Sequence, residues 1–325
     1  MDDPLLKIEK VSKSYGRRII LKDITIDVRP GEILGIIGAS GTGKTTLLNT
    51  IIGFIRPEAG DVKFKRQNLI STENSIYKSV YKAPTAFKNI FGFAAQVPSF
   101  YEKLTVQENL EYFGELYNLS RETLQANVNT LLKLMNLENS KKILGKNLSG
   151  GMERRLDIAC ALIHNPHLLI LDEPTADLDP VLRGNIWKLI EKINSKGTTI
   201  ILSSHHLNEI EALCSRIVII KDGEVNAVGS AEELKAQFTK DQEIRIETYP
   251  GDYEKLGKKI ARKFKNKITM YKNKGNELLI LSPAPQEILN DVIKEIEKEK
   301  EKVISLRLEK PSLDQLFISL SEEKK

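Results

Sequence analysis

The chain has 325 residues, of which 41% are hydrophobic and 29% are charged. This length predicts two domains rather than one compact core, and the composition excludes disordered chains, collagens and disulfide scaffolds. The formal net charge of +5 arises from 49 basic and 44 acidic residues, an excess too small to indicate nucleic-acid binding by itself.

The lack of a recognisable targeting or membrane-spanning segment, together with the cysteine usage, predicts a cytoplasmic protein. No apolar run approaches the roughly 18 residues that a membrane-spanning helix needs, and the acidic, mixed N-terminal segment MDDPLLKIEK lacks the pattern of a secretory signal. The two cysteines, Cys160 and Cys214, lie far apart and without the neighbours of a metal site. We expect both to be small buried side chains in a reducing compartment.

A phosphate-binding loop is the clearest motif near the N-terminus. Two strands are predicted over residues 5–28 with a turn at 14–17, followed by a strand at 33–37, a loop at 38–43 and a helix at 44–52. The loop fits the pattern GxxxxGK[ST], in which backbone N–H groups and the following helix bind phosphate. The residues expected to bind nucleotide here are Gly38, Ala39, Ser40, Gly41, Thr42, Gly43, Lys44, Thr45 and Thr46.

The position of this loop between a strand and a helix favours a nucleoside triphosphate as the ligand. Lys44 is expected to reach the β and γ phosphates and Thr45 to reach Mg²⁺. An ordinary glycine-rich turn before a core helix is the weaker alternative, because the context matches the motif.

A second motif follows the buried strand predicted at 168–171. The strand delivers Asp172 and Glu173 at its carboxyl end, where ligands of open α/β sheets bind. Asp172 fits a role in holding Mg²⁺, and Glu173 fits the general base that activates water. Without the phosphate loop upstream, these two carboxylates would read as the start of a polar loop.

The remaining elements of the first domain indicate an α/β fold with a parallel sheet core, an antiparallel β subdomain and an inserted helical subdomain. Residues 61–96 show no clear period and give no element. Ser120 is expected to cap the second inserted helix. The other predicted elements are helices at 104–117 and 121–135, a helix at 180–193, a strand at 198–203, a helix at 207–214, strands at 217–220 and 225–228, and a helix at 231–238.

A second domain is expected over residues 239–325. Its elements follow the order βαββαβ of a ferredoxin-like α+β fold, with an added terminal helix at 313–320. A lysine-rich stretch over 255–274 would meet anionic lipid or an acidic partner, but a solvated helix face is the better interpretation. The sequence does not decide whether this domain regulates, braces a dimer or binds an effector.

The motifs resemble those of ABC ATPases over residues 1 to about 238. Leu148, Ser149, Gly150 and Gly151 look like the start of the LSGGQ signature, with Met152 in the fifth place. Further matches are Gln96 for the Q-loop, residues 176–179 for the D-loop, His205 for the switch histidine and Tyr15 for the aromatic residue that stacks on adenine.

The resemblance implies a head-to-tail dimer around two molecules of ATP with Mg²⁺. Ser149, Gly150 and Gly151, before a helix at 152–161, would then contact the γ phosphate held by the opposite subunit. It also implies that Gln96 contributes to Mg²⁺ binding and that Glu173, His205 and Gln96 serve hydrolysis. Tyr15 is alternatively plain packing, and His206 is taken as a spacer.

The sequence around the signature and the tail resemble ATP-binding subunits of ABC-2 type drug and antibiotic exporters. The tail similarity lies in Lys310–Phe317. The resemblance implies a separately encoded membrane permease as partner, a peripheral position at the inner face of the cell membrane and no nucleic-acid partner. Residues 97–101 would form part of the permease contact, with Phe100 and Tyr101 as anchors or as local packing.

Two other classes are weighed against this one. A soluble ABC ATPase that acts on nucleic acid or ribosomes usually has two such domains or a long coiled coil, whereas this chain has one phosphate loop and no sustained heptads. A P-loop kinase or GTPase leaves the signature unexplained. The transported substrate and the choice between homodimer and heterodimer stay open.

Overall fold

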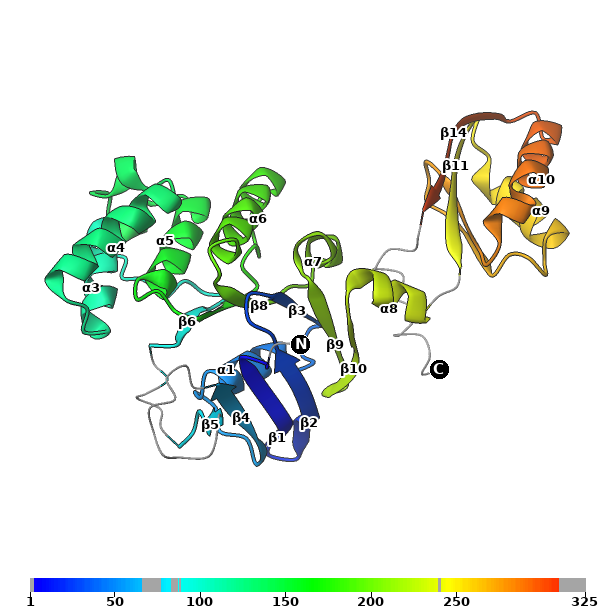
Figure 1. The fold of residues 1–325 in the computed structure, drawn as a ribbon. Coiled ribbons are helices and arrows are strands. Elements are labelled where there is room, and N and C mark those ends of the chain that lie inside the picture. The colour runs from blue at the N-terminus through cyan, green and yellow to red at the C-terminus, as the bar shows by residue number, and fades with distance from the viewer. Residues whose placement is uncertain (1–2, 66–76, 83–86, 88, 239–240, 310–325) are drawn as a thin grey trace. The chain divides into compact units, whose positions relative to one another are not determined.

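The computed structural model describes residues 3–65, 77–82, 87, 89–238 and 241–309 (Figure 1). The chain divides into two compact units, Met1–Ser230 and Ala231–Lys325. The helix at 231–238 therefore groups with the second unit, whereas the sequence places the boundary after it. Within the described ranges no helix combines the length and the apolar character needed to cross a bilayer.

An antiparallel sheet with the order β2-β1-β4-β5 opens the first unit. Alternating apolar residues place Leu6, Ile8 and Phe64 on one buried face. The strands are β1 (Leu6–Tyr15), β2 (Arg18–Val28), β4 (Ala59–Lys65) and β5 (Tyr77–Ser79). The pair of strands predicted over 5–28 is confirmed.

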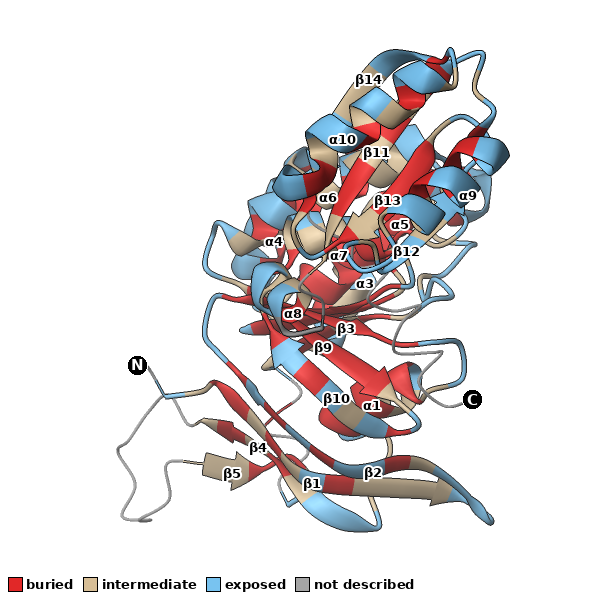
Figure 2. Ribbon diagram, turned by 90° about the vertical axis from the view of Figure 1, so that its right-hand side faces the viewer, coloured by how far each residue is buried: buried red, intermediate tan, exposed pale blue. Residues whose placement is uncertain are grey.

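The central sheet has the order β10-β9-β3-β8-β7-β6, and its strands are parallel except β10. Figure 2 shows β3 and β9 buried along most of their length, as continuous apolar strands are when both faces are covered. The strands are β3 (Ile33–Ile37), β6 (Phe91–Ala94), β7 (Leu168–Asp172), β8 (Thr199–Ser203), β9 (Arg216–Lys221) and β10 (Glu224–Gly229).

Helix α1 (Lys44–Ile51) packs between the two sheets (Figure 1). Its side chains Leu47, Leu48 and Ile51 belong to the apolar cluster that also holds residues of β1 and β3. This position fixes the start of α1 against the carboxyl end of β3. Two further helices of the core are α6 (Pro180–Asn194) and α7 (Leu207–Leu213).

A group of helices lies beside β6 (Figure 1). Thr105 forms a capping box with Glu108, and the Ser120 hydroxyl accepts a hydrogen bond from the Thr123 N–H at 3.2 Å, which confirms Ser120 as a cap. The helices are α3 (Val106–Leu116), α4 (Arg121–Leu134) and α5 (Gly150–Leu162), with short 3₁₀ turns at Glu138–Ser140 and Gly145–Asn147. Cys160 on α5 and Cys214 after α7 are both buried, as expected.

The stretch at 61–96 contains strands that the sequence analysis did not predict. The described parts hold the end of β4, the short β5 and the four-residue β6. Strand β6 is selected by its parallel pairing with β7, in which Phe91 lies opposite Leu168. Such short segments carry no periodic signal of their own, because cross-strand packing decides their conformation.

The second unit folds with the predicted order βαββαβ, and its antiparallel sheet has the order β12-β13-β11-β14. Its core joins apolar side chains of the sheet and of its two longer helices, such as Ile246, Ile260 and Ile288. The elements are α8 (Ala231–Phe238), β11 (Gln242–Tyr249), α9 (Tyr253–Lys263), β12 (Met270–Asn273), β13 (Leu278–Ser282), α10 (Pro285–Lys298) and β14 (Lys302–Glu309). The predicted terminal helix and the tail motif at 310–317 lie outside the described residues.

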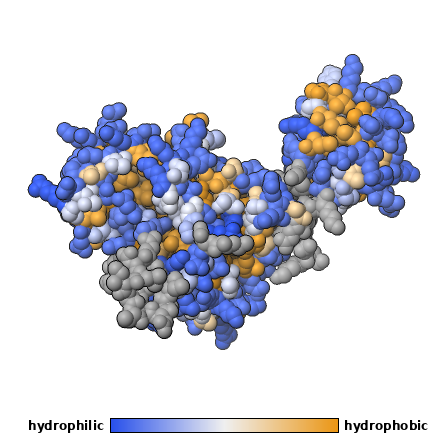
Figure 3. Space-filling view, in the orientation of Figure 1, coloured by the Kyte–Doolittle hydropathy of each residue, from blue (hydrophilic) through white to orange (hydrophobic). Residues whose placement is uncertain are grey.

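The lysine-rich stretch of the second unit is largely ion-paired with acidic residues. Glu299, the residue that follows α10, pairs with Lys255 and Lys259, and Glu295 within that helix pairs with Lys263. These contacts favour a solvated helix face over a lipid-binding one. Figure 3 shows that the viewed surface of this unit is mostly hydrophilic, with one patch of hydrophobic residues. The exposed apolar residues of the sheet-edge strand β14 are Val303, Ile304 and Leu308.

Candidate active site

Close contacts with β2 and β9 leave no room for a side chain at two glycines of the loop at 38–43. A Cβ on Gly38 would lie 2.5 Å from Thr42 Oγ1 and 2.7 Å from the Ile220 carbonyl oxygen. Gly43 has a φ of 98°, and a Cβ there would lie 2.9 Å from the Ile20 carbonyl oxygen. Lys44 is buried, and its Nζ donates to the carbonyl oxygen of Gly38 at 2.9 Å. Glycine is therefore required at both positions for the backbone to curve around an anion.

Residues from four separate motifs line one cavity of about 670 Å³. It is bounded by the start of α1 and by the carboxyl ends of β6, β7 and β8, where parallel strands direct their ligands. The predicted site residues among its lining are Ser40, Gly41, Gly43, Lys44, Thr45, Thr46, Gln96, Glu173 and His205. The tertiary fold thus brings together residues that are far apart in the sequence.

Arg18 and Ile20 of β2 also line this cavity, and the sequence analysis missed both. Both lie at the start of β2, where no local pattern marked them as site residues. Tyr15, the residue expected to stack on adenine, is 52% exposed and lies outside the lining, with Lys13 Nζ 5.5 Å from its ring centre. The role of Tyr15 stays a prediction.

The ends of β7 and β8 hold the two carboxylates in different ways. Asp172 is 2% exposed, and Ser203 donates to its Oδ1 at 2.5 Å. The N–H of Glu173 donates to the same Ser203 hydroxyl at 3.0 Å. The sequence analysis missed Ser203, although its position at the end of the strand next to β7 was the available signal.

Glu173 faces the predicted switch histidine. Its Oε2 lies 2.8 Å from His205 Nδ1 and accepts from the His205 backbone N–H at 3.3 Å. The Glu173 side chain is 12% exposed, whereas that of His205 is 57% exposed. Burial and the neighbouring His205 lower the pKa of His206, whose ring centre lies 4.0 Å from that of His205.

The signature residues do not line this cavity. Ser149 is the N-cap position of α5 without a side-chain capping bond, and the helix begins at Gly150 rather than at 152. Gly151 packs on α6, where an added Cβ would lie 2.9 Å from Leu182 Cδ2. Asp179 of the D-loop caps α6 by accepting from the N–H groups of Val181 and Leu182. Within one chain the signature therefore stands apart from the phosphate loop.

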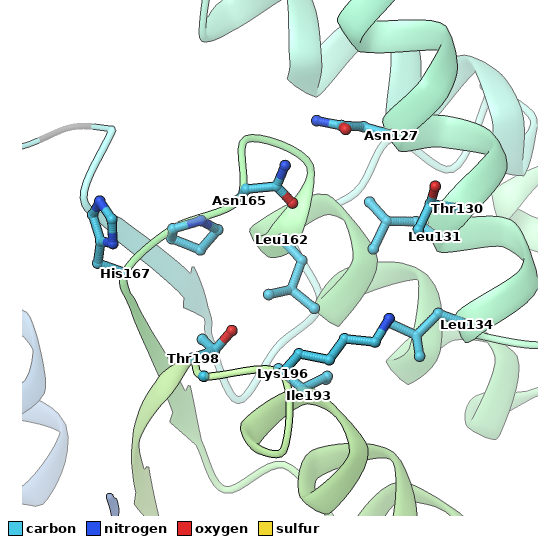
Figure 4. A pocket seen from close by; sticks show the side chains of 12 residues that line it. Asn127, Thr130, Leu131, Leu134, Leu162, Asn165, His167, Ile193, Lys196 and Thr198 are labelled. Atoms are coloured by element: carbon cyan, nitrogen blue, oxygen red, sulfur yellow. The ribbon is translucent and has the colours of Figure 1, made fainter. Parts of the chain in front are cut away.

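A second cavity of about 340 Å³ holds none of the predicted site residues. In Figure 4, Asn127, Thr130 and Leu131 of α4 line one side of it, and His167 and Thr198 line the other. His167 directly precedes β7 and Thr198 directly precedes β8, so the cavity lies at the opposite end of those strands from Asp172 and Glu173.

The residues of the first cavity fit a nucleoside triphosphate with Mg²⁺. The glycine positions allow close backbone approach, and Lys44, Arg18 and the start of α1 supply positive charge. Thr45 and Gln96 offer oxygen atoms as ligands, and the buried Asp172 ends β7, the strand that pairs with β6 just before Gln96. Among the described residues no group of three or more His, Cys, Asp or Glu side chains could hold a metal ion. The predicted magnesium ligands are Thr45, Gln96 and Asp172, and only Asp172 belongs to these four residue types.

Family models match both parts of the chain. Residues 21–176 match the model described as ABC transporter, and residues 229–321 match the model of the C-terminal domain of DrrA1-3-like ATP-binding proteins.

Curated relatives match along almost the whole chain. The linearmycin resistance ATP-binding protein LnrL of Bacillus subtilis (strain 168) is 32% identical over 320 residues, which cover 98% of each chain. The daunorubicin resistance ATP-binding protein DrrA3 of Streptomyces coeruleorubidus is 29% identical over 99% of this chain and 97% of its own. The Nod factor export ATP-binding protein I of Bradyrhizobium diazoefficiens is 32% identical over 89% of each.

Solved structures agree with the sequence matches. The ATP-binding subunit of an ABC transporter is 30% identical with a TM-score of 0.63 and covers 72% of this chain and 93% of its own. The cbiO1 protein of Clostridium perfringens, part of the ABC transporter complex cbiONQ, is 26% identical with a TM-score of 0.63 and covers 82% of this chain and 97% of its own. The family and the fold class predicted from the motifs are confirmed. The chain belongs to the ABC transporter family and is one of its ATP-hydrolysing, ATP-binding proteins.

Proposed function

We propose that this chain is the ATPase subunit of an ABC-2 type exporter, which dimerises head to tail around two Mg-ATP and acts on a separately encoded permease. The observation that carries the proposal is the convergence of nine predicted residues on one cavity, with Glu173 held against His205. Relatives named as resistance and export ATP-binding proteins support the exporter class. The subunit would lie on the inner face of the cell membrane through its permease.

Each residue of the cavity has a role that its contacts support. The loop at 38–46 would hold the triphosphate, and Thr45, Gln96 and Asp172 would hold Mg²⁺, which neutralises phosphate charge when bound. Glu173 is suited to accept a proton from water, because its carboxylate lines the cavity and one of its oxygens is fixed by His205. Ser203 would orient the Asp172 carboxylate through its 2.5 Å hydrogen bond.

The separation of the signature from the phosphate loop supports the dimer. Ser149, Gly150 and Gly151 start a thirteen-residue helix whose N–H groups suit an anion, yet they do not line the cavity of their own chain. A second copy related by a two-fold axis would bring its signature to this cavity and receive the same in return.

Residues 97–101 support a contact with the permease. Val97 is 77% exposed, and Tyr101 is 48% exposed with its ring centre 4.8 Å from that of Tyr112. Phe100 packs locally instead, since its Cε2 would lie 2.8 Å from a Cβ added to Gly145. We therefore assign the anchor role to Val97 and Tyr101 rather than to Phe100.

The decisive experiment replaces the proposed general base. In Glu173→Gln, ATP hydrolysis should fall by about 10²- to 10⁴-fold, and gel filtration with saturating ATP and Mg²⁺ should show a dimer. Glu277→Gln makes the same chemical change in the second unit, at a side chain that is 15% exposed and paired with Arg245, and should keep the wild-type rate. A Glu173→Gln protein that stays monomeric under these conditions would refute the head-to-tail assembly. Co-purification with a multi-span membrane protein tests the permease.

A further inference from the structure

A buried ion pair lies on α5, one turn after the signature. Arg154 is 5% exposed, and its Nη1 lies 3.1 Å from Oδ2 of Asp157, whose side chain is fully buried. Burial raises the pKa of Asp157, and Ser99 and Arg154 oppose that rise. Burial lowers the pKa of Arg154. Because each charge lacks water, each depends on the other and on its hydrogen bonds.

The guanidinium of Arg154 donates to three backbone carbonyls outside its own helix. Nη1 donates to Ala95 at 2.5 Å, Nη2 to Asp172 at 3.0 Å and Nε to Pro174 at 2.9 Å. Ala95 directly precedes Gln96, and the other two carbonyls flank Glu173. One side chain therefore holds the backbone beside both cavity residues.

Asp157 holds the other side of the Gln96 segment. Its Oδ1 accepts from the backbone N–H of Ser99 at 2.8 Å and from the Ser99 hydroxyl at 3.1 Å. The segment from Ala95 to Ser99 is thus bound at both ends to one ion pair, and both members of that pair lie on α5.

We propose that Arg154 and Asp157 are positioning residues that set Gln96 and Glu173 relative to the signature helix, so that a displacement of α5 is passed to both. The inference rests on the hydrolytic roles given to Gln96 and Glu173 above. The planar fork of arginine donates in several fixed directions at once, whereas lysine presents a point charge on a flexible stem. Lysine at this position keeps the charge but cannot reach all three carbonyls.

The test is Arg154→Lys, with kcat and KM measured separately. The kcat should fall by about 10²-fold, as expected when catalytic groups are misplaced by about 1 Å. The KM for ATP and the affinity for a fluorescent ATP analogue should stay within about threefold, because Arg154 makes none of the contacts of the phosphate loop.

Arg216→Lys is the matched control. Arg216 is also a poorly exposed arginine, paired with Glu32 at 2.9 Å and bonded to the carbonyl oxygen of Asp27. It lies at the start of β9, and neither it nor Glu32 lines the cavity. This variant should lose comparable stability in thermal unfolding and keep the wild-type kcat.

Hydrogen exchange provides a readout that general destabilisation does not reproduce. Arg154→Lys should raise amide exchange in both 95–99 and 172–174 relative to Arg216→Lys. If Arg154→Lys does not fold, Asp157→Asn supplies the comparison, with exchange raised at Ser99 and kcat lowered. Equal kcat values in the Arg154 or Asp157 variant and in the control would overturn the proposal. If the kcat values are equal while Glu173→Gln loses hydrolysis, the positioning role of Arg154 and Asp157 is wrong and the proposed function stands. Normal hydrolysis in Glu173→Gln would instead refute the proposed function.

Discussion

One carboxylate oxygen of Glu173 contacts two nitrogen atoms of His205. Oε2 of Glu173 lies 2.8 Å from His205 Nδ1 and 3.3 Å from the His205 backbone nitrogen. Glu173 also has a φ of 50°, a left-handed conformation that residues other than glycine seldom adopt. The glutamate is therefore held by the loop after β8 as well as by its own strand.

Removal of the His205 ring should release the Glu173 carboxylate. We expect His205→Ala to lower kcat by about 10²-fold with little change in KM, because the base loses its fixed position while the phosphate loop is intact. His206→Ala is the control, since the side chain of His206 has no hydrogen bond to Glu173 among the described contacts. Steady-state ATPase assays separate the two variants, and equal losses in both would contradict the pairing.

The phosphate loop should not tolerate a side chain at Gly43. Gly43→Ala places a Cβ 2.9 Å from the Ile20 carbonyl oxygen at a φ of 98°, which costs about 1–2 kcal/mol for the backbone alone. We expect at least a tenfold loss of ATP affinity, measured by calorimetry. Gly184→Ala is the opposite case: it lies within α6 and an added Cβ meets nothing within 4 Å, so the free energy of unfolding should rise by about 0.5–1 kcal/mol. Unchanged ATP affinity in Gly43→Ala would show that the loop binds the nucleotide otherwise.

Stability should fall in mild acid because of His164. Burial lowers the pKa of His164 from 6.5 to about 4, and its ring stacks on Tyr117 with centres 3.6 Å apart. The unfolded chain binds the proton more readily than the folded chain. The contribution of the neutral His164 to the free energy of unfolding is therefore complete above pH 6.5 and is lost as the pH falls toward 4. The shift between these two pKa values corresponds to about 3 kcal/mol of stability.

His164→Phe keeps an aromatic ring for the stacking contact and removes the titration. Its free energy of unfolding, measured in urea, should fall less than that of the wild type between neutral pH and pH 5. Parallel decreases in the two proteins would show that other groups account for the acid sensitivity.

The phosphate loop, the strand before Asp172 and the signature were predictable because each is a contiguous segment with its own physical signal. Glycine spacing, continuous apolar runs and capping residues act over a few residues. For the same reason the βαββαβ order of the second unit and the cap at Ser120 were recognisable, although β12 begins two residues later than the predicted strand at 268–271.

The strands β4, β5 and β6 could not be predicted from local signals. Strands β5 and β6 have only three and four residues, and the partners of β4 and β6, which are β1 and β7, lie far away in the chain. Arg18 and Ile20 likewise join the cavity only once β2 lies next to the phosphate loop. Arg154 and Asp157 read as ordinary polar residues of a helix until the fold buries them.

The amino-acid sequence by itself determined the family, the order of the elements and the residues of the motifs, since these depend on local chemistry. Only the tertiary structure decided which of those residues share a cavity, that Ser203 holds Asp172, and that one arginine reaches the backbone beside both Gln96 and Glu173. Such contacts join segments far apart along the chain, and their distances are set by packing of the central sheet and α5 rather than by any local pattern.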